Sequence, residues 1–186
     1  MKLITITGPS GAGKDTVAKM MSKMTDWPVI CSYTTRPRRF GEVAGEDHYF
    51  VDKCDVPCEK MLAYTQYGGY EYWTMVDQIK DIAIYVIDEA GLVDLKKHHS
   101  EITVYSIYVF SPAVTRLTRD VKLSRILRDE ERLKLTADND YDYCIYNDFC
   151  MNLKNLCFEV ARCVCHMPFV KEHIDPYDPK KQHFTD

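Results

Sequence analysis

The segment ITITGPSGAGKDT, residues 4–16, is the most informative part of this sequence for predicting the fold. The residues that lead into its glycines, KLITITG, alternate and are rich in β-branched side chains, which predicts a strand. Beyond the glycines, Val17, Met20, Met21 and Met24 recur at helical spacing. A glycine-rich segment between a strand and a helix is the setting of a phosphate-binding loop, and it disfavours the alternative of a turn without a ligand.

The loop follows the pattern G-x-x-x-x-G-K-[ST] from Gly8 to Lys14, except that Asp15 stands where Ser or Thr is usual. Successive backbone N–H groups and the helix N-terminus would bind phosphate oxygens, and Lys14 would add a mobile positive charge. Asp15 could hold Mg²⁺ through a carboxylate oxygen, with Thr16 as the alternative ligand. The residues expected to bind ATP are therefore Gly8, Pro9, Ser10, Gly11, Ala12, Gly13, Lys14, Asp15 and Thr16.

Composition excludes several classes of protein. The 186 residues suit one domain, and the net charge of −4 argues against a general binder of nucleic-acid polymers. No apolar run reaches the roughly 18 residues of a membrane span, and the N-terminus lacks the pattern of a signal peptide, so we expect a cytoplasmic protein. The eight cysteines lack a convincing zinc spacing, which predicts reduced, mostly buried thiols.

Strands and helices alternate along the chain, which predicts an α/β fold with a parallel sheet flanked by helices. Further strands are expected at residues 27–34, 81–88, 102–110 and 141–147, and helices within 112–137 and 148–164. Short aromatic-rich strands are expected between residues 49 and 74. The segment 166–186 contains three prolines without periodicity, which predicts an extended tail that lies on the surface or is disordered.

A second anion site is indicated by CSYTTRPRRFGEVAGEDHYF, residues 31–50. Arg36, Arg38 and Arg39 crowd one loop of an acidic protein, and arginine forks bind phosphate through paired hydrogen bonds. The alternative is a solvated cluster of charges, which the phosphate loop makes less favourable. Tyr72 and Thr74, in YGGYEYWT, offer further hydroxyl groups for a phosphate and a stacked base.

Four segments, GPSGAGKDT, SYTTRPRRFGEVAGEDHYFV, YGGYEYWT and YVIDEAG, resemble guanylate kinases in order and spacing. The resemblance covers residues 1 to about 165 and implies a P-loop kinase with a mixed-β monophosphate-binding arm at 33–74 and a short helical lid at 115–130. Residues 166–186 would form a C-terminal tail. The implied reaction transfers the γ-phosphoryl group of ATP, with Mg²⁺, to GMP or dGMP, giving GDP or dGDP and ADP.

The resemblance also implies roles for individual residues. Arg36, Arg39 and Tyr72 would bind the acceptor phosphate, where His48 replaces a phosphate-binding tyrosine and Tyr49 could substitute for it. Ser32 and Thr74 would contact the base or the neighbouring phosphate. Asp88 would face the base, although its place after a strand equally suits a Mg²⁺-side carboxylate. The catalytic charges would come from Lys14, Arg39, Arg119 and Arg125, and Asn147 would lie near the donor adenine.

Departures from the family pattern leave the acceptor open. Ala63 stands where the family has a glutamate that accepts hydrogen bonds from guanine, and Trp73 replaces a glycine. Loss of a hydrogen-bonding carboxylate should relax base selectivity. The chain could therefore phosphorylate another deoxynucleoside monophosphate or ribose 1,5-bisphosphate, or be a non-catalytic guanylate kinase-like binding module. The expected partners are small-molecule nucleotides, and the sequence predicts no oligomeric state.

Overall fold

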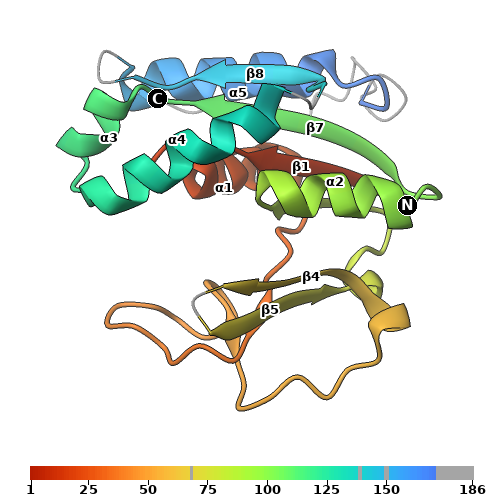
Figure 1. Cartoon of the computed structure of the whole chain (residues 1–186). Helices are drawn as coiled ribbons and strands as arrows, with labels where there is room; N and C mark the ends of the chain where they lie inside the picture. The colour runs from red at the N-terminus through yellow and green to blue at the C-terminus, as the bar shows by residue number, and fades with distance from the viewer. Residues whose placement is uncertain (68, 138–139, 149–150, 171–186) are drawn as a thin grey trace.

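A four-stranded parallel sheet in the order β6-β1-β7-β8 forms the core (Figure 1). Its strands are β1 (Lys2–Thr7), β6 (Ile82–Val86), β7 (Thr103–Phe110) and β8 (Tyr143–Tyr146). Central β1 pairs with both neighbours, Ile4 lying opposite Ile84 and Tyr105. The computed structural model describes residues 1–67, 69–137, 140–148 and 151–170.

Helices cover both faces of this sheet because its strands are apolar on both sides. α1 (Lys14–Thr25) and α5 (Leu153–His166) pack on one face, where Ile4 and Ile107 are fully buried. α2 (Glu89–His98) packs on the other face, against Leu3 and Tyr85. The expected α/β class is confirmed.

A second, mixed sheet in the order β3-β2-β5-β4 forms the arm. It consists of β2 (Tyr33–Thr34), β3 (Tyr49–Phe50), β4 (Met61–Tyr67) and β5 (Tyr70–Met75), with short 3₁₀ turns at Cys58–Lys60 and Val76–Gln78. Strand β2 is parallel to β3 and antiparallel to β5. Figure 1 shows the arm as a layer separate from the core sheet. Strand β4 of the arm runs along α2 of the core.

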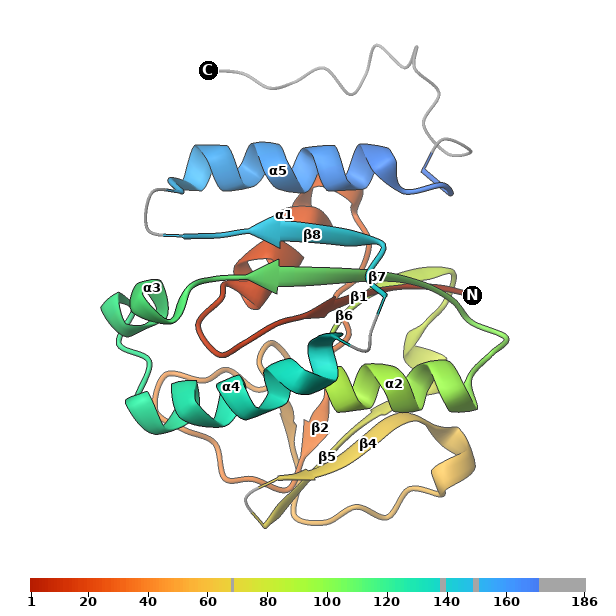
Figure 2. The same ribbon diagram turned by 45° about the horizontal axis from the view of Figure 1, so that its top comes forward.

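The charged segment after β7 forms two helices, α3 (Ala113–Thr118) and α4 (Leu123–Ala137). The chain turns between them at Asp120, whose φ of 58° is left-handed and incompatible with a continuous helix. Figure 2 shows α4 crossing the same side of the core as α2. The arginine-rich segment, folded into these two helices, therefore lies against the core.

Three expectations fail in detail. Residues 27–34 do not form one strand, because Val29 makes a single bridge to Ile84 and the chain then leaves for the arm. Met167, Phe169 and Val170 are buried, so packing extends past residue 165, where a surface tail was expected; residues 171–186 lie outside the described part. Of the seven described cysteines, all free thiols, only Cys163 is buried.

Candidate active site

The phosphate loop joins β1 to α1 in a conformation that requires glycine. Gly8 has a φ of 138°, and a Cβ atom there would lie 2.3 Å from the Val109 carbonyl oxygen. Gly13 has a φ of 96°, and its Cβ would lie 2.6 Å from Asn147 Nδ2. Both positions combine a left-handed backbone with close contact, so the loop is specified by its glycines.

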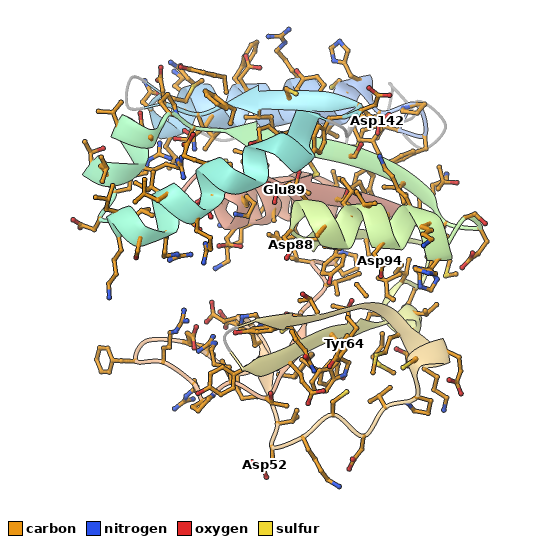
Figure 3. All side chains as sticks on the ribbon, in the orientation of Figure 1. Asp52, Tyr64, Asp88, Glu89, Asp94 and Asp142 are labelled. Atoms are coloured by element: carbon orange, nitrogen blue, oxygen red, sulfur yellow. The ribbon has the colours of Figure 1, made fainter. Side chains whose placement is uncertain are left out.

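Lys14 lies at the end of this loop, where its Nζ donates to the carbonyl oxygens of Gly8 and Pro9 at 2.8 and 3.1 Å. Burial lowers the pKa of the Lys14 ammonium, while the Asp15 and Glu89 carboxylates oppose that shift. A cavity of about 190 Å³ opens beside it, lined among others by Ser10, Asp88, Glu89, Arg128 and Asp129. Figure 3 shows Asp88 and Glu89 together where α2 begins.

A second cavity of about 390 Å³ lies on the other side of the loop, lined in part by Asp15, Thr16, Arg119 and Asn147. Asn147 is buried and donates through Nδ2 to the Ala12 carbonyl at 2.8 Å. Arg119 donates to the Gly11 carbonyl at 3.0 Å and to Asn147 Oδ1 at 3.2 Å. The structure thus groups Arg119 with the residues expected on the donor side.

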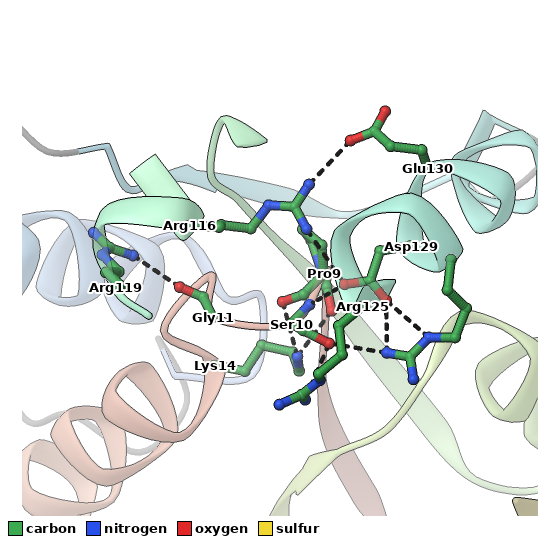
Figure 4. Close-up of polar contacts among 11 residues, drawn as sticks. Pro9, Ser10, Gly11, Lys14, Arg116, Arg119, Arg125, Asp129 and Glu130 are labelled. Carbon is green, nitrogen blue, oxygen red and sulfur yellow. Dashed lines mark hydrogen bonds and ion pairs between the residues drawn. The ribbon is translucent and has the colours of Figure 1, made fainter. Parts of the chain in front are cut away.

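Helix α4 is fastened to the phosphate loop at Ser10 (Figure 4). The Ser10 backbone N–H donates to Asp129 Oδ2 at 2.8 Å, and Arg125 and Arg128 each donate to Ser10 Oγ at 3.1 Å. Arg119 and Arg125, expected to act together, thus bond to the adjacent loop residues Gly11 and Ser10. Arg128 shares the Ser10 hydroxyl with Arg125.

The Asp129 carboxylate, bonded to two arginines, holds α4 in place against the phosphate loop. Asp129 is buried and accepts from fully buried Arg116 at 3.3 Å and from Arg128 at 2.8 Å. Burial alone would raise the pKa of the Asp129 carboxyl, but the hydrogen bonds from Arg128 and Ser10 lower it below its ordinary value. Sequence reasoning missed Glu89, Arg128 and Asp129 as site residues, since a charged helix gives no signal for which side faces a loop.

In the arm, Arg36 is buried and paired with Glu42. The guanidinium donates to both Glu42 carboxylate oxygens, at 2.7 and 3.1 Å, and lies 5.6 Å from the Phe50 ring centre. This pairing lowers the pKa of Glu42 to about 2. Glu42 also accepts from the backbone N–H of Arg39 at 2.7 Å, while Arg39 itself is exposed. Glu42 was a further missed residue, because its partner could not be identified from sequence.

His48 and Tyr72 lie on the same face of the arm sheet, with ring centres 5.8 Å apart. The Ser32 hydroxyl is 2.8 Å from His48 Nδ1. Burial, aided by the charge of Arg36, lowers the pKa of His48. Tyr49 instead stacks on Tyr33, with ring centres 4.8 Å apart, on the opposite face. The structure therefore brings together Ser32, His48 and Tyr72, and separates Tyr49 from them.

Thr74 is fully buried, and its hydroxyl lies 3.1 Å from the Tyr85 hydroxyl of β6. Ala63 pairs with Thr74 across β4 and β5. Trp73 is buried on the other face, stacked on Tyr33. Asp88 caps α2 by accepting from the Gly91 backbone N–H at 2.7 Å. Thr74 and Asp88, both expected near the acceptor, are thus already engaged within the protein.

The described residues contain no group of three or more His, Cys, Asp or Glu side chains arranged to hold a metal ion. In the same part of the chain, no helix has the length and apolar character needed to cross a membrane.

Known proteins that are similar in sequence to this chain are guanylate kinases. The model of the guanylate kinase family matches residues 1–164. A guanylate kinase of Rickettsia felis is 32% identical, covering 83% of this chain and 90% of its own, and one of Chlamydia caviae is 30% identical, covering 79% and 80%.

Solved structures are similar in fold. The crystal structure of guanylate kinase from Anaplasma phagocytophilum has a TM-score of 0.63 at 21% identity, covering 88% of this chain and 84% of that one. An unliganded sugar kinase from Janibacter has a TM-score of 0.52 at 15% identity, covering 91% and 98%. The chain therefore belongs to the guanylate kinase family of nucleoside monophosphate kinases.

Proposed function

We propose that this enzyme transfers the γ-phosphoryl group of ATP to GMP or dGMP, giving ADP and GDP or dGDP. The observation that supports this best is the pair of cationic sites. Lys14, Arg125 and Arg128 gather at the phosphate loop, and Arg36 is held in the arm by Glu42. Two sites of this kind suit a donor triphosphate and an acceptor monophosphate. The family to which the chain belongs supports the same assignment.

The proposed reaction relies on positioning and on charge. Backbone N–H groups of the loop bind the donor phosphates, and Lys14 exchanges its carbonyl partners for phosphate oxygens. Arg125 and Arg128 stabilise the migrating group, and Arg36, Arg39, His48 and Tyr72 hold the acceptor phosphate. The acceptor is already an anion, so its attack needs no general base of unusual pKa.

The donor nucleoside is proposed to occupy the cavity lined by Arg119 and Asn147. The arm at residues 33–74 and the lid at 115–130 would enclose the substrates and exclude water. Enclosure strengthens the electrostatic contribution of the arginines because the local dielectric falls.

Mg²⁺ is also part of the proposal. Asp15 and Thr16 are exposed at the start of α1 and supply oxygen atoms, which this ion prefers. Mg²⁺ is usually held by one or two carboxylates together with substrate phosphates and water, so the lack of a larger cluster among the described residues fits. When bound, the ion would neutralise charge on the donor phosphates.

Replacing Lys14 tests the proposal. We expect Lys14→Ala to lower kcat by at least about a hundredfold, the effect of removing one preorganised charge-stabilising donor. The measurement is coupled ADP release with ATP, Mg²⁺ and a panel of GMP, dGMP, AMP, CMP, dTMP and ribose 1,5-bisphosphate.

Lys19→Ala is the matched control, because Lys19 is exposed on the same helix, and it should retain wild-type turnover. Near-normal turnover of Lys14→Ala would contradict the role of the loop. Absence of ADP release from the wild-type enzyme with every acceptor would favour a binding module.

A further inference from the structure

Tyr85 connects the core sheet to the arm at the end of the acceptor site. It belongs to β6, and its side chain is buried among Leu62, Leu92 and other apolar residues. Its hydroxyl lies 3.1 Å from the Thr74 hydroxyl of β5. Burial raises the pKa of Tyr85 to about 12, so the phenol is neutral at physiological pH and takes part as a hydroxyl group.

The hydroxyl pair is closed to a ligand in this arrangement. Thr74 has no exposed surface and Tyr85 is 7% exposed. The Thr74 hydroxyl donates to the Tyr85 oxygen, so a base could receive a hydrogen bond from Thr74 only by displacing Tyr85. Because a new hydrogen bond would replace an existing one, the net gain in binding would be small.

The other groups near this end offer little base discrimination. Ala63, which faces Thr74 across the strand pair, has no polar group. The Ser32 hydroxyl is already bonded to His48. Asp88 uses Oδ1 to cap α2, and its second oxygen has no hydrogen-bond partner in the described part of the chain.

A single carboxylate oxygen cannot separate one base from another. It only accepts hydrogen bonds, and guanine, adenine, cytosine and thymine each present at least one N–H donor. Strong rejection of a wrong base requires buried polar groups that the wrong base leaves unpaired. Such a set is not formed by Ala63, Thr74 and Asp88.

We infer that Tyr85 withdraws the Thr74 hydroxyl from the base, and that this enzyme, lacking a set of polar groups that distinguishes the bases, phosphorylates nucleoside monophosphates with different bases. The inference rests on the proposed function and extends it from GMP to a class of acceptors. Phosphate recognition by Arg36 and the fit of the base would then supply most of the binding.

Acceptor selectivity is measured as kcat/KM for GMP, AMP, CMP and dTMP at fixed ATP and Mg²⁺. We expect the wild-type values to differ by no more than about 200-fold, the range of fit without specific hydrogen bonding. Ala63→Glu should raise the ratio of GMP to AMP at least about tenfold, because its carboxylate accepts from guanine N1–H and the 2-amino group and repels the adenine N1 lone pair. Ala63→Gln, of similar size but uncharged, should raise it less.

The role of Tyr85 is tested by Tyr85→Phe, which releases the Thr74 hydroxyl. We expect kcat/KM for GMP and AMP to rise about three- to tenfold, the value of one hydrogen bond, with KM for ATP unchanged. Adding Thr74→Val to Tyr85→Phe should reverse this gain. A residue that merely supports the arm would give no gain to reverse.

Two results would overturn the inference: a wild-type preference for GMP above about 10⁴-fold, which is the range of a site built on hydrogen bonds, or no gain in Tyr85→Phe. If no acceptor is phosphorylated at all, the proposed function is wrong instead. The dissociation constants of GMP and AMP, from calorimetry, then supply the same ratios and still decide the selectivity.

Discussion

His48 shows at the scale of one residue how burial sets the charge of a site. Its pKa is lowered from 6.5, mainly by burial and also by Arg36, so the ring is neutral at pH 7. With its Nδ1 next to the Ser32 hydroxyl, a neutral ring can still donate one hydrogen bond to a phosphate. We therefore expect the proposed acceptor site to take its positive charge from arginine and not from histidine.

A pH dependence of stability follows from this shift. Because the folded pKa of His48 is below the unfolded value, the unfolded chain binds more protons as the pH falls through 6.5. The stabilisation is fully present above pH 6.5 and is lost as the pH falls to the folded pKa. We expect the free energy of unfolding, measured with urea between pH 5 and 7.5, to fall on acidification.

His48→Gln should flatten this dependence, because glutamine does not titrate in that range. His98→Gln is the control, since His98 is exposed at the end of α2 and pairs with Asp94 of the same helix, and it should not flatten the slope as His48→Gln does. An equal slope in His48→Gln and the wild type would contradict the assignment.

At the scale of an element, α4 is positioned by one buried carboxylate. Asp129 connects Arg116, Arg128 and the Ser10 backbone, so it orients the helix relative to the phosphate loop. The contact joins residues 119 positions apart in the chain. Arg125 and Arg128 consequently both reach the Ser10 hydroxyl.

Asp129→Asn should lower the free energy of unfolding by about 1–3 kcal/mol, because buried Arg116 and Ser10 lose a charged acceptor. The loss should be smaller than the roughly 3–5 kcal/mol of a wholly broken buried pair, since Arg116 keeps Glu130. Denaturant unfolding measures it, and KM for ATP should rise in parallel.

Glu130→Gln is the matched control for Asp129→Asn. Glu130 binds the same Arg116 at 3.0 Å but is 47% exposed. Its removal should cost no more than about 1 kcal/mol, as is usual for an exposed ion pair. Equal losses in the two variants would show that burial does not distinguish the two carboxylates.

For the whole molecule, the distance between core and arm decides whether the two proposed substrates can react. The cavity beside Lys14 is lined by residues of the core and of α4, and by none of the described arm residues 33–67 and 69–75. Phosphoryl transfer needs the reacting atoms about 3–3.5 Å apart. For the proposed reaction, we therefore expect the arm to approach the core when both substrates are bound.

We expect a decrease in the radius of gyration, measured by small-angle X-ray scattering, when a non-hydrolysable ATP analogue and GMP are both present. GMP should contribute nothing to this decrease in Arg36→Ala, because that variant lacks the buried guanidinium of the acceptor site. An unchanged radius with both ligands bound, verified by calorimetry, would contradict closure.

Much of the architecture followed from the sequence because it depends on local constraints. The alternation of KLITIT, the glycines at positions 8 and 13 and the following helix predict the loop, and the structure has them where expected. The strand at residues 27–34 failed because its two halves join different sheets, which no local pattern reveals.

Local patterns were sufficient to predict the phosphate loop, the α/β class and the arginine-rich arm, since backbone geometry and residue type act over a few positions. Which side chains meet depends on the packing of distant elements. That packing pairs Asp129 with Ser10 and joins Thr74 to Tyr85 across two sheets. Burial then fixes the charge and the hydrogen bonding of the side chains that meet. Neither the contacts nor these charges can therefore be predicted from the spacing of residues in the sequence.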